Sequence, residues 1–206
     1  MALVMLMRHG EAENNVQHIV AGRKSEHHLT DNGRMQVRSA AEKLKDLSID
    51  AIYTSPVVRT VETSQIVSET IGVDYTVDER LTETEMGSLV GMRMSEIIEK
   101  YDDLFHKFYY NDDALKETGL ERFSSIGSRM NSMLDYVAER HPDKNVLLVT
   151  HLDPIKAAIT RIMDLNPEVL FNMTIKNASL TILKHGSKDY SLSAFNVMDI
   201  SRYTLE

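Results

Sequence analysis

The chain of 206 residues has no cysteine and no tryptophan, and only four prolines and nine glycines. The absence of cysteine excludes disulfides, thiolate zinc sites and a cysteine nucleophile. Hydrophobic residues make up 42% and charged residues 26% of the chain, which is typical of a soluble folded domain. The length suits a single domain over residues 1–206. No apolar run reaches the roughly 20 residues needed to cross a bilayer, so no membrane contact is expected.

An excess of basic charge is also missing. Lysine and arginine number 23 against 31 aspartates and glutamates, for a formal net charge of −8. Nucleic acids and anionic membranes are bound mainly through basic side chains, so neither is an expected partner. The apolar residues 1–7 have no basic residue before them and no small-residue cleavage site, which predicts a cytoplasmic protein. An anionic substrate would have to be bound by local positive charge in a pocket.

Short apolar runs alternate with amphipathic patterns along the chain. Strands buried on both faces are predicted at residues 1–7, 50–54 and 145–149, where continuous apolar runs end abruptly at polar residues. Helical patterns occupy residues 30–47, 58–71, 123–140 and 153–163. Residues 179–183 and 190–197 predict a closing antiparallel hairpin. This alternation predicts an α/β three-layer sandwich with a mostly parallel mixed sheet.

Two stretches invite further expectations. Residues 92–120 are rich in charge and in aromatic side chains but have no clean core stripe. We expect a partly helical insertion there that covers the end of the sheet as a lid, the alternative being an ordinary surface helix and loop. The last predicted strand could pair between subunits, which makes a homodimer one expectation.

Two histidines follow predicted strands, in the position where open α/β sheets bind ligands. His9 follows the first strand and is preceded by Arg8, and His151 follows the strand at 145–149. Arg59 lies one turn into the helix that begins after Pro56. The planar guanidinium binds phosphate in a bidentate manner, and two arginines neutralise a dianion. Because a neutral imidazole can attack phosphorus directly, these residues predict an anion pocket with a histidine nucleophile.

A leaving alkoxide must be protonated, which requires a carboxylic acid near the pocket. The spacing of the sequence does not choose among the candidates, which are Glu11, Glu13, Glu83, Glu85 and Asp153.

Several short motifs follow one another from residue 8 to about 156. They are Arg8-His9-Gly10-Glu11, Leu29-Thr30-Asp31-Asn32-Gly33, Thr54-Ser55-Pro56 with Arg59 and Thr63, Leu81-Thr82-Glu83 with Gly87 and Gly91, and Val149-Thr150-His151. A single Arg-His-Gly would be weak evidence, but the ordered set is specific. The chain thereby resembles the histidine phosphatase superfamily, the phosphoglycerate mutase-like proteins.

The resemblance implies roles for the matched positions. His9 would be phosphorylated, while Arg8, Arg59 and His151 would bind the transferring phosphoryl group. Glu83 would protonate the leaving oxygen and then activate water, for which partial burial should raise its pKa. The alternatives are that Arg59 forms a salt bridge with Glu62 and that Glu83 is a solvated loop acid.

The resemblance also implies a substrate side of the pocket. It would be lined by Asn15, by the backbone of Ala21 and Gly22, and by the N–H of Leu152. The expected partner is a small phosphorylated substrate, and this chemistry requires no metal and no cofactor. Met86, Met92 and Met94 are candidates for an apolar mouth.

The sequence departs from the family pattern at several positions. Leu152-Asp153 stands where Gly-Gly is common, and Lys156 stands where arginine is frequent. Asp153 either brings negative charge to the pocket or caps the helix that opens at Pro154, and we favour the cap. Arg23 and Lys24 follow Gly22 in place of a Gly-x-Trp; they would meet an anionic substrate tail or, as we favour, remain solvated.

Membership of such a family leaves the reaction open. Its cofactor-dependent mutases carry an adjacent arginine pair and a proline-rich stretch in the insertion, and residues 92–120 have neither. We therefore predict a phosphatase acting on small phosphate monoesters. The alternatives are a phosphoglycerate mutase that depends on 2,3-bisphosphoglycerate, and a non-catalytic module that binds phosphorylated ligands. The intact His9, Glu83 and two arginines argue against the module.

Overall fold

The computed structural model describes residues 2–101, 103–186 and 189–198. In these residues a six-stranded sheet has the order β3-β2-β4-β1-β5-β6. The strands are β1 (Ala2–Arg8), β2 (Ala51–Thr54), β3 (Tyr75–Val77), β4 (Val146–Thr150), β5 (Leu180–His185) and β6 (Tyr190–Val197). The first four are parallel to one another, whereas β5 and β6 form the antiparallel hairpin expected from the sequence.

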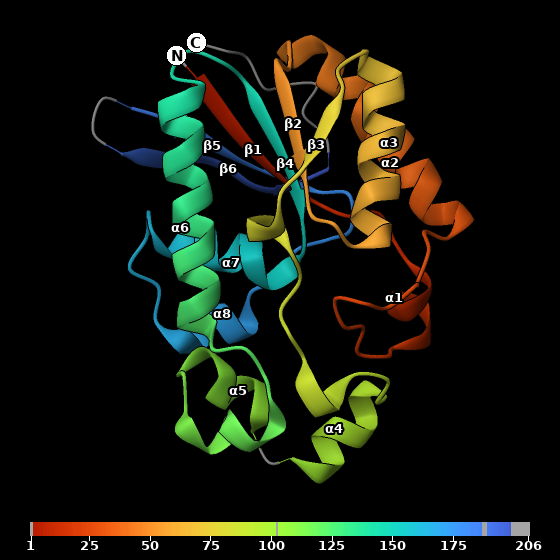
Figure 1. The fold of residues 1–206 in the computed structure, drawn as a ribbon, viewed down its shortest axis with the longest axis vertical. Coiled ribbons are helices and arrows are strands. Elements are labelled where there is room, and N and C mark those ends of the chain that lie inside the picture. The colour runs from red at the N-terminus through yellow and green to blue at the C-terminus, as the bar shows by residue number, and fades with distance from the viewer. Residues whose placement is uncertain (1, 102, 187–188, 199–206) are drawn as a thin grey trace.

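Helices cover both faces of the sheet (Figure 1). Alternate side chains of β1 show why. Leu3 and Met5 belong to a core shared with α2 (Asp31–Leu44) and α3 (Val58–Ile71), whereas Val4 and Leu6 belong to one shared with α6 (Phe123–Arg140) and α7 (Leu152–Thr160). A strand buried on both faces is therefore apolar throughout. The predicted three-layer α/β sandwich with a mostly parallel mixed sheet is confirmed.

The lengths of the elements differ from the sequence prediction in a few places. Strand β3 was not predicted, because three residues give too short a pattern. The helix expected to reach residue 163 ends at Thr160, and the short helices α1 (Glu13–Gln17) and α8 (Pro167–Asn172) were also missed. Single turns of 3-10 helix lie at Lys45–Leu47, Glu79–Leu81 and Gly87–Leu89.

The residues 92–120 form helices beyond the carboxyl ends of the parallel strands (Figure 1). These are α4 (Met94–Lys100), α5 (Leu104–Tyr109) and a 3-10 helix, Asp113–Thr118. Ile97, Leu104 and Phe108 are buried in the core on the α6 side. Tyr109 and Leu120 are buried there as well. The segment thus has the helical character expected of it, and its buried residues are spread over separate short elements. In the parts of the chain that the structure describes, no helix is long and apolar enough to span a membrane.

The strand pairing brings the ends of β1, β2 and β4 together. Arg8 pairs with Thr150 in the register of β1 and β4, and Thr54 of β2 pairs with Val149. The backbone N–H of His9 donates to the carbonyl of Thr150 at 3.1 Å. Residues that follow three separate strands therefore meet at one edge of the sheet.

Candidate active site

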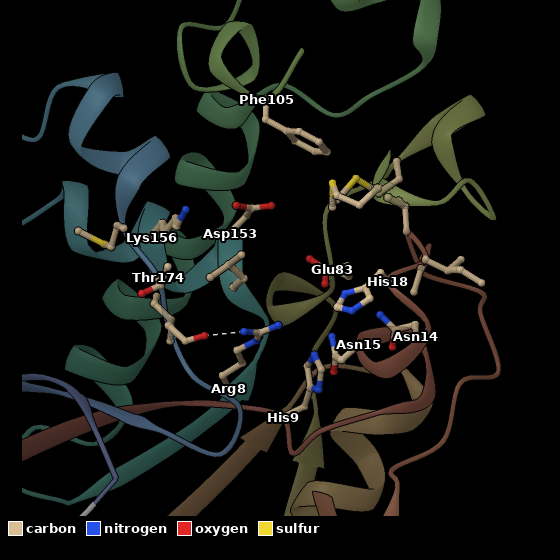
Figure 2. Close-up of a pocket in the computed structure, with 18 of the residues that line it drawn as sticks. Arg8, His9, Asn14, Asn15, His18, Glu83, Phe105, Asp153, Lys156 and Thr174 are labelled. Atoms are coloured by element: carbon tan, nitrogen blue, oxygen red, sulfur yellow. Dashed lines mark hydrogen bonds between the residues drawn. The ribbon is translucent and has the colours of Figure 1, made fainter. Parts of the chain in front are cut away.

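A cavity of about 460 Å³ lies at this edge (Figure 2). Arg8 and His9 line the end next to the sheet, and Phe105 lies farther out. Met86 and Met94 add further apolar surface to the lining. Glu83 and Asp153 are the two of the five candidate acids that line the cavity. The cavity therefore combines a charged end with an apolar end.

Close backbone packing fixes the loop after His9. A Cβ atom on Gly10 would lie 2.7 Å from the carbonyl oxygen of Gly33, and one on Gly33 would lie 1.9 Å from that of Glu11. Thr30 caps α2 by accepting from the N–H of Gly33 at 2.9 Å, and its hydroxyl donates to the Glu11 carboxylate at 2.6 Å. The start of α2 thus lies directly against the nucleophile loop, which explains why the two motifs occur together.

The ring of His9 is held in one tautomer. Its Nδ1 lies 2.7 Å from the carbonyl oxygen of Gly10, which can only accept, so Nδ1 carries the proton. Its Nε2 accepts from Nε of Arg59 at 3.3 Å. Burial, together with the positive charge of Arg59 and neighbouring residues, lowers the pKa of His9 well below its usual value. His9 is therefore neutral, and the lone pair of its Nε2 accepts from Arg59.

Two arginines lie close to His9, of which Arg8 is partly buried and Arg59 is buried. Arg8 donates from Nη1 to the carbonyl of Ile175, and Arg59 is only 1% exposed. Burial lowers the pKa of both guanidinium groups, which nevertheless remain charged. Nε of Arg8 and Nη1 of Arg59 are buried and find no hydrogen-bond partner among the residues that the structure describes. Unsatisfied buried donors are unfavourable, so both positions fit a bound anion.

Glu83 lies in a cluster of hydrogen-bond donors. Its Oε2 is 3.1 Å from Nη2 of Arg59 and 3.2 Å from Nδ1 of His151, and its Oε1 accepts from the N–H of Thr84 at 2.8 Å. Burial by itself would raise the pKa of Glu83, but His151, Arg59 and Thr84 outweigh it and hold the pKa far below its usual range. The expectation of a raised pKa is therefore wrong, and Glu83 is ionised in this structure.

His151 completes the cluster. Its ring is fully buried and lies 5.3 Å from that of His9, centroid to centroid. Its Nε2 is 2.8 Å from the hydroxyl of Ser55. Burial is the main cause that lowers the pKa of His151 to about 4. Arg59 accordingly contacts His9, Glu83 and His151, and the alternative that it pairs with Glu62 is excluded because Glu62 pairs with Arg34.

A second shell of charged residues supports the Glu83 backbone. Nε of Arg23 donates to the Glu83 carbonyl at 2.7 Å, and Arg129 donates to the same oxygen at 3.4 Å. Both arginines also bind the carboxylate of Glu121. Arg23 is partly exposed, but its guanidinium binds Glu83 and Glu121, which neither expectation for it included; Lys24 is exposed as expected.

The other predicted substrate residues fare differently. Asn15, Ala21 and Leu152 line the cavity. Gly22 does not, and its N–H donates to the hydroxyl of Ser25 at 2.7 Å. The expectation that the Gly22 backbone lines the substrate side is therefore not met.

The favoured role of Asp153 as a helix cap is wrong. His151 is the N-cap of α7, and Asp153 lies within the first turn. Its side chain instead lines the cavity and accepts from the hydroxyl of Tyr109 at 2.8 Å. Sequence reasoning also missed the cavity residues Asn14, His18, Tyr109, Lys156 and Thr174. The sequence offered two signals for them: Asn14 is next to the predicted Asn15, and Lys156 departs from the family pattern.

Comparisons with known proteins agree with this geometry. The family model of the histidine phosphatase superfamily (branch 1) matches residues 4–198. A 2,3-bisphosphoglycerate-dependent phosphoglycerate mutase of Thermoplasma acidophilum is 30% identical over 183 residues, 89% of this chain and 87% of that protein. Phosphoserine phosphatase 1 of Hydrogenobacter thermophilus is 26% identical, over 89% of this chain and 86% of that protein.

The fold is shared with solved structures as well. A mycobacterial glucosyl-3-phosphoglycerate phosphatase superposes with a TM-score of 0.83 at 24% identity, covering 94% of this chain and 98% of that one. The chain belongs to the histidine phosphatase superfamily, whose named relatives here include both phosphatases and mutases.

Proposed function

We propose that this protein is a phosphatase that hydrolyses small phosphate monoesters through a phosphohistidine intermediate on His9. The observation that carries the proposal is a pair of buried guanidinium donors that find no partner among the described residues, Nε of Arg8 and Nη1 of Arg59, near the neutral His9. The lone pair of His9 Nε2 accepts from Nε of Arg59 at 3.3 Å, and it is released for attack when this guanidinium turns to the phosphate. The two positive charges match a phosphate dianion, and the neutral imidazole can attack it without a separate base.

In the first step, Nε2 of His9 attacks phosphorus and the bond from phosphorus to the ester oxygen breaks. The proton for the departing alkoxide comes from Glu83. This acid is ionised while it pairs with Arg59, at 3.1 Å. A phosphate dianion that binds Arg59 competes with this pairing and brings negative charge close to Glu83, and both effects raise the pKa of the carboxyl. Substrate binding thus prepares Glu83 to hold the proton.

In the second step, water attacks the phosphohistidine. The Glu83 carboxylate left by the first step accepts a proton from this water, and the bond from Nε2 to phosphorus breaks to release inorganic phosphate. We propose that Arg8, Arg59 and His151 stabilise the charge on the phosphoryl oxygens in both steps. The route uses no metal ion and no organic cofactor.

The outer end of the cavity supports a phosphatase rather than a mutase, which would transfer the phosphoryl group from His9 back to a substrate molecule. A mutase that binds phosphoglycerates needs cationic groups for the carboxylate and for the second phosphate of its substrates. Lys156 and Arg8 are the lysine and arginine side chains that line the cavity in the described residues, and Nζ of Lys156 is already bonded to Tyr109 and to the carbonyl of Leu170. The segment 92–120 contributes Met94, Phe105 and Tyr109 to the lining, and none of these side chains is cationic.

The test is release of inorganic phosphate from 4-nitrophenyl phosphate. We expect wild-type protein to release phosphate, to form an acid-labile phosphoenzyme on rapid quenching, and to lose both in His9→Ala. His28→Ala, a change at an exposed histidine, is the matched control and should keep both.

Two results would reject the proposal in favour of the other functions. Interconversion of 2- and 3-phosphoglycerate that exceeds phosphate release and requires 2,3-bisphosphoglycerate would identify a mutase. Binding of phosphate esters without turnover and without phosphoenzyme would identify a non-catalytic module.

A further inference from the structure

A carboxylate that the proposed reaction does not use lies in the wall of the cavity. Asp153 is 8% exposed, and Figure 2 shows its side chain pointing into the space bounded by Arg8, Glu83 and Phe105. A second negative charge beside Glu83 opposes the binding of a phosphate dianion. Hydrolysis through His9 and Glu83 requires no such group, so its presence calls for a different partner.

The contacts of Asp153 leave part of its bonding capacity open. Its Oδ1 accepts from the hydroxyl of Tyr109 at 2.8 Å, and its Oδ2 is 3.4 Å from the hydroxyl of Thr84. An ionised carboxylate has about four acceptor positions, so about two are free. No lysine, arginine or histidine of the described residues forms an ion pair with it. Burial is the main cause that raises the pKa of Asp153, as expected for a carboxylate that lacks a direct counterion.

Lys156 determines the direction in which the Tyr109 hydroxyl donates its hydrogen bond. Its Nζ donates to the Tyr109 hydroxyl at 2.7 Å and to the carbonyl of Leu170 at 2.7 Å. Because the tyrosine oxygen accepts from Lys156, its single proton is directed to Asp153. Lys156 therefore forms its hydrogen bond with the hydroxyl and not with Asp153, and the hydroxyl holds the carboxylate in one orientation at the cavity wall.

Resting on the proposed function, we propose that Asp153 selects phosphate monoesters whose alcohol is largely apolar and carries an ammonium group. With the phosphate at Arg8 and Arg59, an alcohol that extends toward Phe105 passes Asp153, which lies between Arg8 and Phe105 in Figure 2. An ammonium donates to the free acceptor positions and supplies the missing counterion. Hydrogen bonds between charged groups are stronger than those between neutral ones, so a neutral alcohol of the same shape binds less well.

The test compares esters that differ by one amino group, namely 3- and 4-(aminomethyl)phenyl phosphate against 3- and 4-methylphenyl phosphate. For wild-type protein we expect kcat/KM to be at least about tenfold higher for one aminomethyl ester than for its methyl counterpart. In Asp153→Asn this ratio should fall to about one, because the amide carries no charge to pair with the ammonium. Asp143→Asn, in the exposed turn before β4, is the control that should keep the ratio.

The possible results distinguish a failure of the proposed ammonium selectivity from a failure of the proposed phosphatase activity. Equal kcat/KM for both members of each pair in wild-type protein overturns the inference and leaves the proposed function standing. An equal loss for both esters in Asp153→Asn also overturns it, because Asp153 then serves only to hold Tyr109. The wild-type comparison decides even where the variant does not fold.

Binding of unreactive analogues covers the case in which no ester is hydrolysed. In [3-(aminomethyl)benzyl]phosphonate and (3-methylbenzyl)phosphonate, and in the corresponding 4-isomers, a methylene replaces the ester oxygen. A calorimetric Kd at least about tenfold lower for an aminomethyl analogue than for its methyl counterpart would support the selectivity, even if the protein hydrolyses no ester and the proposed phosphatase activity is wrong. Equal Kd values would overturn it.

Discussion

Glu83→Gln should separate phosphate esters by their leaving groups. Glutamine keeps the size of the side chain but cannot act as an acid. Removal of a general acid slows a reaction by about 10² to 10⁴-fold when the leaving group needs a proton. We expect kcat/KM for benzyl phosphate, whose alkoxide is a poor leaving group, to fall by that factor, or about 3 to 5 kcal/mol in the barrier. For 4-nitrophenyl phosphate, whose phenolate leaves as an anion, the loss should stay below about tenfold.

The structure also indicates what the substitution does to folding. An amide oxygen at the position of Oε2 still accepts from Arg59, but the amide nitrogen then faces the N–H of Thr84, whose 2.8 Å hydrogen bond is lost. Leaving one buried donor unsatisfied costs about 1 to 3 kcal/mol of folding free energy. A domain with ordinary stability remains folded after such a loss, and thermal unfolding would verify this.

The measurement is kcat/KM, because this constant reports the steps up to formation of the phosphoenzyme and not its later hydrolysis. Glu85→Gln is the matched control, since it lies two residues away with a side chain that is 45% exposed. It should affect both esters by less than about twofold. If Glu83→Gln slowed both esters by the same factor, Glu83 would act on the phosphoryl charge or the fold, and its assignment as proton donor would be refuted.

Two further predictions concern stability. His9 and His151 stay neutral in the folded protein, whereas histidines of the unfolded chain take up protons below about pH 6.5. The free energy of unfolding should therefore fall as the pH decreases, by about 1.4 kcal/mol per pH unit for each histidine. For His151 this fall should end at about pH 4, where the folded protein also binds the proton. Urea unfolding between about pH 7.5 and about pH 5 would show this slope, which should be smaller in His9→Asn; an unchanged slope in that variant would contradict the burial argument. Gly33→Ala should lose at least about 2 kcal/mol, because its Cβ would collide with the Glu11 carbonyl. In Gly127→Ala, on α6, the new Cβ would meet no atom within 4 Å, so the free energy of unfolding should instead rise by about 0.5 to 1 kcal/mol. Denaturation midpoints that shift in the same direction in both variants would refute the packing argument.

Much of the fold followed from local patterns. The strands β1 and β4 were recognisable because burial on both faces requires continuous apolar residues, and α3 and α6 because one face of each helix packs on the sheet. The strand β3 and the helices α1 and α8 were missed, since elements of three to six residues carry too little periodicity. Their existence depends on neighbouring elements that are distant in sequence.

The site shows the same division. Arg8, His9, Arg59 and His151 could be singled out because each lies at the end of a strand or the start of a helix, and parallel strands place those ends together. Asp153 was misjudged because its position before a proline suits a cap, whereas its partner, Tyr109, comes from the lid. Arg23 was misjudged because its partners, Glu83 and Glu121, lie 60 and 98 positions away.

The sequence alone therefore determined the fold class, the family and the set of residues that meet at the end of the sheet. These depend on hydrophobic period and on motifs of a few residues, both of which are local properties. Only the tertiary structure decided the charge states and pairings, namely a neutral His9, an ionised Glu83 bound by Arg59, and Asp153 oriented by Tyr109. A pKa depends on burial and on charges within a few ångströms, and those neighbours come from segments far apart in the chain.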